Sequence, residues 1–195
     1  MKDIVLRALE ESIRVKERFI KENMEGLLTV AQRLATCFAA GYKLLIFGNG
    51  GSAADAQHIA AEFVNRFTVE RKPLPALALT TDTSILTSIA NDYSFDEVFS
   101  KQIKALGRKD DIAWGISTSG NSKNVLLAVE TARKMGLYTL GLTGCNGGKL
   151  SHCCDLALIV DSQATPRIQE THIIVGHILC DLVDRILFPE SFMAT

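Results

Sequence analysis

Proline and tryptophan are scarce in this 195-residue chain, and no segment is dominated by one or two residue types. Blocks of like charge are also missing, and the formal net charge is −1. The balanced charge argues against a nucleic-acid surface and a basic membrane patch. The apolar fraction of 47% is ordinary for a globular protein. We therefore expect residues 1–195 to form one domain with a sizeable core.

The chain also lacks a long uncharged apolar run. Its most apolar stretch, IIVGHILCDLVDRILF at 173–188, contains His177, Asp181, Asp184 and Arg185 and is too short to span a bilayer. The N-terminal residues are charged throughout and do not resemble a signal peptide. Five cysteines occur without a CxxC pair, which favours reduced thiols. We expect a cytoplasmic protein without a membrane partner.

Two different periodicities divide the chain. Residues 2–40 contain no proline and keep an approximately helical apolar period, which predicts two helices or one long bent helix. From residue 41 on, short apolar runs alternate with helical patterns at 52–66, 82–106, 121–135 and 166–188. The runs lie at 43–48, 74–80, 111–117, 138–144 and 156–161. This alternation predicts an α/β fold, a three-layer α/β/α sandwich around a five-stranded parallel sheet.

Ligands of such sheets bind beyond the carboxyl ends of the strands. The loop STSGNS at 117–122 follows the third apolar run and places four hydroxyl groups at a helix N-terminus. Free backbone N–H groups and the positive end of the helix dipole favour an anion there. The loop contains no lysine or arginine, so hydroxyl and amide groups alone would hold a phosphate. The alternative is a simple capping loop.

The turn GNGGSA at 48–53 loosely matches a dinucleotide fingerprint. The acidic residue that this fingerprint requires about twenty residues later is missing, so the dinucleotide interpretation is weak. Ser52 and Asp55 have the spacing of a capping box. His58 and Glu62 then lie four residues apart on one helix face and can reach one point. Spacing alone favours a solvated ion pair over a metal or catalytic site.

A second polar set lies in the last predicted helix, for which Thr165 is the expected N-cap. Gln169, His172 and His177 interrupt an otherwise apolar pattern there. Gln169 and His177 would be about 12 Å apart along an ideal helix. One metal ion could bind both residues only if their side chains extended toward each other. Helix geometry therefore does not decide whether Gln169 and His177 share a metal ion.

Together, GNGGSAADAQHIAAEF, LTTDTSILTSIANDYSFDEVF, STSGNS, LTGCNGG and RIQETHIIVGHILCDLVD closely resemble the bacterial phosphoheptose isomerase family. Its members are built on a flavodoxin-like sugar-isomerase (SIS) domain. The resemblance covers nearly the whole chain. It implies an α/β core at 41–195 and an N-terminal helical segment at 1–40 that serves oligomerisation.

The resemblance also implies an activity. Members convert D-sedoheptulose 7-phosphate to D-glycero-D-manno-heptose 7-phosphate, an aldose–ketose isomerisation through an enediol(ate). This is the first step toward the ADP- or GDP-heptose precursors of lipopolysaccharide core or surface glycans. The family forms cytoplasmic homotetramers with active sites at subunit interfaces and one zinc ion per subunit.

Residue roles follow from the same resemblance, by motif position. The implied acid–base pair is Glu62 and His177. The implied zinc ligands are His58, Glu62, Gln169 and His177. The implied substrate-binding residues are Asn49, Gly50, Gly51, Glu62, Asn91, Asp92, Ser117, Thr118, Ser119, Ser122 and Gln169.

Two alternatives have a different character. A non-catalytic, tetrameric SIS-domain partner of the bacterial replication initiator shares the RIQE and ND motifs and the DLxDxxLFP ending, which DLVDRILFP at 181–189 resembles. That paralogue lacks the metal-site glutamate, whereas this chain has Glu62. The other alternative is a different SIS isomerase or a sugar-phosphate sensor, which fold alone would allow.

Overall fold

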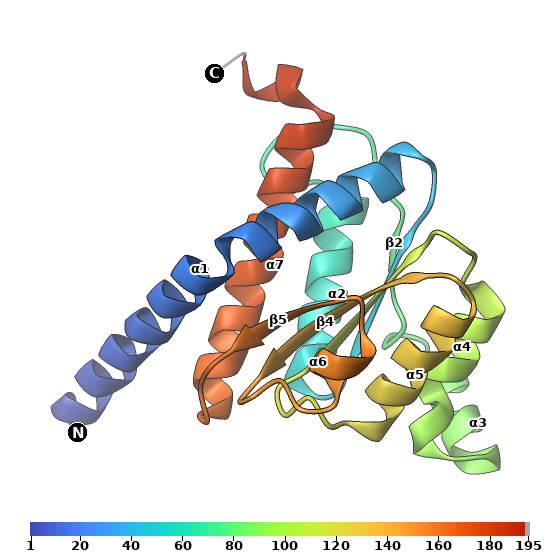
Figure 1. The fold of residues 1–195 in the computed structure, drawn as a ribbon, viewed down its shortest axis with the longest axis horizontal. Coiled ribbons are helices and arrows are strands. Elements are labelled where there is room, and N and C mark those ends of the chain that lie inside the picture. Colours follow the sequence, from blue (N-terminus) through green and yellow to red (C-terminus); the bar gives the residue numbers. More distant parts are fainter. Residues whose placement is uncertain (194–195) are drawn as a thin grey trace.

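The computed structural model describes residues 1–193 and contains a five-stranded sheet between two layers of helices (Figure 1). The strands are β1 (Leu44–Gly48), β2 (Ala76–Ala78), β3 (Ile112–Ser117), β4 (Tyr138–Gly144) and β5 (Leu156–Val160). The α-helices are α1 (Lys2–Ala39), α2 (Gly51–Val64), α3 (Thr83–Asp92), α4 (Val98–Leu106), α5 (Lys123–Lys134), α6 (Leu150–Cys153) and α7 (Thr165–Leu187). Two short 3₁₀ helices, η1 (Phe95–Glu97) and η2 (Pro189–Phe192), complete the chain.

The sheet has the strand order β2-β1-β3-β4-β5, and every neighbouring pair is parallel. Successive side chains of a strand point to opposite faces. In β1, Leu44 and Ile46 enter one hydrophobic core, whereas Leu45 and Phe47 enter the other. Both faces of the sheet are therefore buried, which explains why its strands read as continuous apolar runs in the sequence.

Helices α1, α2 and α7 cover one face of the sheet, and α3, α4, α5 and α6 cover the other (Figure 1). The predicted fold class, a three-layer α/β/α sandwich with an N-terminal helical segment, is confirmed. No helix among residues 1–193 is both long enough and apolar enough to cross a membrane. All five cysteines are free.

The N-terminal segment is one continuous helix rather than two. Gly26 lies inside it without breaking it, and the Leu158 side chain packs so closely there that a Cβ at position 26 would approach it to 3.0 Å. The second half of α1 buries Leu27, Leu34 and Phe38 in the core. The first half extends beyond the sheet (Figure 1) and exposes large apolar side chains, namely Ile4, Val5, Leu6, Leu9 and Ile13.

Two predicted helix caps are wrong. Gly50 is the N-cap of α2, and Ser52 donates its backbone N–H to Asn49 instead of capping with its side chain. Helix α7 already includes Thr165, so Ala164 occupies the N-cap position. Neither helix start has a side-chain cap, and α2 begins at the glycine turn that follows β1.

Candidate active site

The carboxyl ends of β1, β3 and β4 meet at one edge of the sheet, as parallel pairing requires. Asn49, just after β1, and Asn124, in the first turn of α5, exchange two side-chain hydrogen bonds of 2.9 and 2.8 Å. Asn124 is buried and also accepts a hydrogen bond from the backbone N–H of Val125. The pair fixes the glycine turn beside the serine-rich loop. Sequence reasoning missed Asn124, because nothing in the sequence distinguishes it from a surface asparagine.

The loop at 117–122 has the features of an anion site. Ser122 occupies the N-cap of α5, yet its hydroxyl does not cap the helix. Instead Ser122 Oγ lies 3.0 Å from Ser117 Oγ, while Ser119 Oγ accepts the N–H of Asn121 at 3.2 Å. The first-turn N–H groups of α5 lack a side-chain cap, apart from that of Val125. This arrangement favours phosphate binding over the simple capping loop.

The glycine turn comes close to α7. Gly50 adopts φ +54°, a conformation that favours glycine, and Gly51 begins α2. A Cβ at Gly51 would collide with the side-chain amide of Gln169, while a Cβ at Gly176 would lie 2.7 Å from Ile59. Helices α2 and α7 therefore run side by side in close contact. The structure places Gln169 directly against the turn that was predicted to bind substrate.

Further along the same two helices, His58, Glu62 and His177 come together. His58 Nε2 lies 2.9 Å from His177 Nε2 and 3.3 Å from Glu62 Oε1. The His177 ring stacks on Phe67, with ring centroids 5.5 Å apart. The side chain of Glu62 is 23% exposed and that of His58 is 48% exposed, so ligands can reach both. An isolated surface pair of His58 and Glu62 would not include a second imidazole from another helix.

The donor atoms of this group are of the kind that binds zinc, and two of their separations are close to those between zinc ligands. Ligand atoms 2.0–2.1 Å from a tetrahedral zinc stand about 3.3 Å apart. The separations of 2.9 and 3.3 Å are close to that value, and imidazole nitrogen with carboxylate oxygen is a usual zinc donor set. As they stand, however, no three histidine, cysteine, aspartate or glutamate side chains in residues 1–193 surround a common metal position. Small side-chain movements would be needed.

Gln169, the fourth predicted ligand, is not part of this group. It lies at Gly51, at the start of α2, whereas His58 and Glu62 lie about two and three turns further along that helix. In the described chain it makes no hydrogen bond to His58, Glu62 or His177. Three of the four predicted ligands are therefore brought together.

Asn91 and Asp92 form the exposed C-terminal end of α3. The Asn91 amide donates to the Asp92 carboxylate at 2.9 Å, and within residues 1–193 no hydrogen bond links either side chain to the loops after β1 and β3. Of the predicted substrate-binding residues, these two are the ones that the structure does not connect to the site.

Two buried titratable groups near the site were not predicted to have a role. Burial raises the pKa of Asp55 to about 6, although His58 opposes this shift, and one carboxylate oxygen has no partner. Burial lowers the pKa of His172 to about 4, while the hydrogen bond to the Thr143 carbonyl opposes this shift. His172 Nδ1 also lacks a partner. His172 is thus a neutral core histidine.

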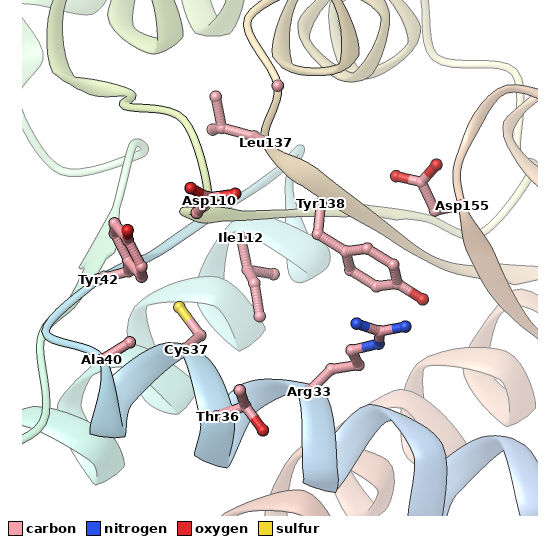
Figure 2. A pocket seen from close by; sticks show the side chains of 11 residues that line it. Arg33, Thr36, Cys37, Ala40, Tyr42, Asp110, Ile112, Leu137, Tyr138 and Asp155 are labelled. Atoms are coloured by element: carbon pink, nitrogen blue, oxygen red, sulfur yellow. The ribbon is translucent and has the colours of Figure 1, made fainter.

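A cavity of about 430 Å³ lies at the amino ends of the strands, between α1 and the starts of β3 and β4 (Figure 2). Arg33 from α1 points toward the Tyr138 ring there, at 5.1 Å from its centroid. No residue that lines this cavity belongs to the predicted site. His58, Glu62 and His177 instead lie at the surface, outside this cavity.

Sequence comparisons identify the relatives of the chain. A family model described as the SIS domain matches residues 9–144. A phosphoheptose isomerase of Thermodesulfovibrio yellowstonii is 56% identical over 188 residues, which cover 96% of this chain and 94% of that protein. A phosphoheptose isomerase of Clostridium acetobutylicum is 47% identical over 98% of both chains.

Solved structures give the same result. Phosphoheptose isomerase from Neisseria gonorrhoeae matches with a TM-score of 0.89 and 46% identity, covering 94% of this chain and 98% of that chain. A phosphoheptose isomerase from Francisella tularensis matches with a TM-score of 0.91 and 39% identity, covering 94% and 97%. The chain belongs to the phosphoheptose isomerase family of SIS-domain proteins.

Proposed function

We infer that this chain is a phosphoheptose isomerase that interconverts D-sedoheptulose 7-phosphate and D-glycero-D-manno-heptose 7-phosphate. The observation that carries this inference is the convergence of His58, Glu62 and His177 beside a hydroxyl-rich anion loop. Relatives that match nearly the whole chain carry the name of this activity. We propose that the enzyme works in the cytoplasm, at the first step toward heptose precursors of surface glycans, as the family resemblance implies.

The phosphate of the substrate would bind at residues 117–122. Ser117, Ser119 and Ser122 offer hydroxyl groups, and the uncapped start of α5 offers backbone N–H groups. Thr118 adds a fourth hydroxyl group in the same loop. Because the loop brings no cationic side chain, the phosphate keeps most of its charge, which hydrogen bonds from neutral donors compensate.

The sugar chain would extend from this loop along α2 to the reacting group. Asn49, Gly50 and Gly51 allow the backbone to approach the sugar, and Gln169 lies directly against them. Bound in this way, carbons 1 and 2 of the substrate would lie near Glu62 and His177. The hydroxyl groups between them would contact the amides of Asn49 and Gln169.

Isomerisation moves one proton between carbons 1 and 2 and one between their oxygens. Glu62 would take the carbon-bound proton and return it to the neighbouring carbon, and His177 would exchange the proton of the oxygens. Their nearness to His58 gives a single place where both transfers occur. The negative charge that develops on the enediolate oxygens needs stabilisation at this position.

A zinc ion held by His58, Glu62 and His177, together with Gln169, would supply this stabilisation as a Lewis acid. A carboxylate that binds a metal is a weaker base, so the roles of Glu62 as ligand and as base compete.

Assembly as a homotetramer would complete the site. The first half of α1 exposes apolar side chains that a single copy leaves uncovered. Asn91 and Asp92 are exposed on α3 and are available to a site on a neighbouring subunit. Burial of the α1 face by other copies would bring such residues to the open reacting group.

One experiment tests the function directly. The purified protein is incubated with sedoheptulose 7-phosphate in D₂O, and NMR follows product formation and deuterium at carbon 1 or 2, with zinc measured in parallel. We expect turnover with incorporation of solvent deuterium. Failure to turn over the heptulose phosphate, with zinc present, would refute the activity and revive a binding role.

A further inference from the structure

Arg71 is a buried cation in the segment that joins α2 to β2. Its side chain has no exposed surface, and neither has that of its partner Asp184 on α7. The guanidinium donates five hydrogen bonds of 2.8–3.3 Å. The acceptors are the carbonyl oxygens of Glu62, Phe63, Asn65 and Lys72, and Asp184 Oδ1.

These carbonyl acceptors lie where a helix most needs donors. The last carbonyls of an α-helix have no partner within the helix, and the negative end of its dipole lies there. Arg71 donates to the carbonyls of Glu62 and Phe63 at 2.9 and 2.8 Å, in the final turn of α2. The guanidinium therefore caps the C-terminus of α2, in place of a glycine cap.

The other contact joins this turn to the helix that carries the second reacting residue. Arg71 Nε donates to Asp184 Oδ1 at 2.9 Å. Asp184 lies two turns after His177 on α7, and residues seven apart share a helix face.

We propose that Arg71 and Asp184 are positioning residues that hold the backbone of Glu62 at a fixed place relative to His177. This proposal rests on the inferred isomerase function. Neither residue contacts the reacting atoms. They act through the final turn of α2, whose shift would move the Glu62 carboxylate along α7 and away from the two imidazoles.

Stability alone does not require this pair. A buried ion pair replaced by apolar side chains of similar volume often keeps or gains stability, whereas removal of one partner is strongly destabilising. The carbonyl oxygens at the end of α2 also need hydrogen-bond donors, which apolar side chains in place of the pair cannot supply. The pair therefore has two separable effects, and a double variant separates them.

The test compares Asp184→Leu with the double variant Arg71→Met/Asp184→Leu. The single variant leaves the buried guanidinium without its charged partner and should unfold at a clearly lower denaturant concentration. The double variant should recover most of that loss. Its kcat should nevertheless remain about 10- to 100-fold low, because displacement of a reacting group by about 1 Å has effects of this size. KM should change little, since the phosphate loop is untouched.

A conservative variant and a matched control complete the design. Arg71→Lys keeps the charge but cannot span the carbonyls and Asp184 together, so kcat should fall while the fold is retained. The control is Arg185→Met/Asp181→Leu, which removes an exposed 2.8 Å ion pair from the same helix and should leave kcat unchanged. Wild-type kcat in Arg71→Lys, or in a stable Arg71→Met/Asp184→Leu, would overturn the proposal.

Amide hydrogen exchange gives a readout that does not depend on turnover. In Arg71→Lys, exchange at residues 61–65 should be faster than in wild type, with the rest of α2 unchanged. Unchanged exchange there would overturn the positioning role even if the wild-type protein proved inactive on sedoheptulose 7-phosphate. In that case the isomerase function would fail on its own assay.

Discussion

The Nε2 atoms of His58 and His177 lie 2.9 Å apart, although 119 residues separate them in the sequence. Two such nitrogens cannot both carry a proton at this distance. Either one imidazole donates to the other, or both lone pairs face a common cation. Glu62 Oε1, 3.3 Å from His58 Nε2, adds a negative charge to the same place. Two imidazoles and one carboxylate therefore lie close together, as proton transfer or metal binding requires.

Glu62→Gln is nearly isosteric but removes the base and weakens a ligand. The variant should fold normally and lose roughly 100-fold or more in kcat, the scale of a positioned acid–base group. Solvent deuterium should no longer enter the substrate, and zinc content should fall. Lost exchange with retained zinc would favour Glu62 as a base over Glu62 as a ligand. Near-normal turnover would contradict the assignment.

Ser119→Ala and Ser122→Ala each remove one hydroxyl group from the proposed phosphate loop. A hydrogen bond to a charged group contributes about 1 kcal/mol or more, so KM should rise several-fold in each variant while kcat falls less. Steady-state kinetics with sedoheptulose 7-phosphate measure this split. Ser191→Ala, in η2 and outside the predicted site, serves as the control. An unchanged KM in both loop variants would leave only a helix-capping role.

Leu9→Glu/Ile13→Glu places two charges on the exposed apolar face of α1, where these side chains are 57% and 54% exposed. The single copy loses no core contact, so the fold should persist while light scattering shows species smaller than a tetramer. Activity should fall together with assembly if subunits complete each other's sites. Arg7→Glu, which alters charge without removing apolar surface, is the control. A fully active monomer would contradict this prediction.

His172→Gln should reduce the sensitivity of the fold to acid. The pKa of His172 is about 4 in the folded protein and about 6.5 when unfolded. A lowered histidine pKa means stability that is complete above pH 6.5 and is lost as the pH falls toward 4. The loss attributable to His172 between pH 7.5 and 4.5 is about 2.5 kcal/mol. Glutamine can still donate to the Thr143 carbonyl but does not titrate. The urea midpoint of the variant should therefore fall less than that of wild type between pH 7.5 and 4.5.

The pKa shift of Asp55 changes stability with pH in the opposite direction to that of His172, so Asp55 serves as the control. Its pKa is raised to about 6, so its contribution favours the folded state at low pH and is lost as the pH rises from about 4 to 6. Asp55→Asn should therefore increase, not reduce, the acid sensitivity. If both variants show the wild-type pH dependence, other groups control it.

The sheet could be predicted from the sequence because each buried parallel strand reads as an apolar run between helical patterns. Strand β2 starts later than its apolar run at 74–80, since Pro75 lacks the N–H group that a ladder needs. The spacing of His58 and Glu62 indicated one point of action, but only the family resemblance added His177. Its nearness depends on how α2 packs on α7, which local patterns do not encode.

Other parts of the site had no sequence signal at all. Arg71 is one of two arginines in an irregular segment, and Asp184 looks like one more charge in an amphipathic helix. Their pairing across 113 residues depends on the path of the chain after α2. Asn124 likewise gains its importance only from the reciprocal contact with Asn49. Such residues become visible when burial and hydrogen bonds are known.

The close packing of α2 against α7 also has a consequence for biosynthesis. Helix α2 is translated early, whereas α7, which brings Gln169 and His177, is the last long element of the chain. A nascent polypeptide on the ribosome therefore cannot assemble the three-residue group until its final helix has emerged. Prematurely terminated products that end before residue 165 keep His58 and Glu62 but lack one face of the core, and they should be inactive targets for proteolysis.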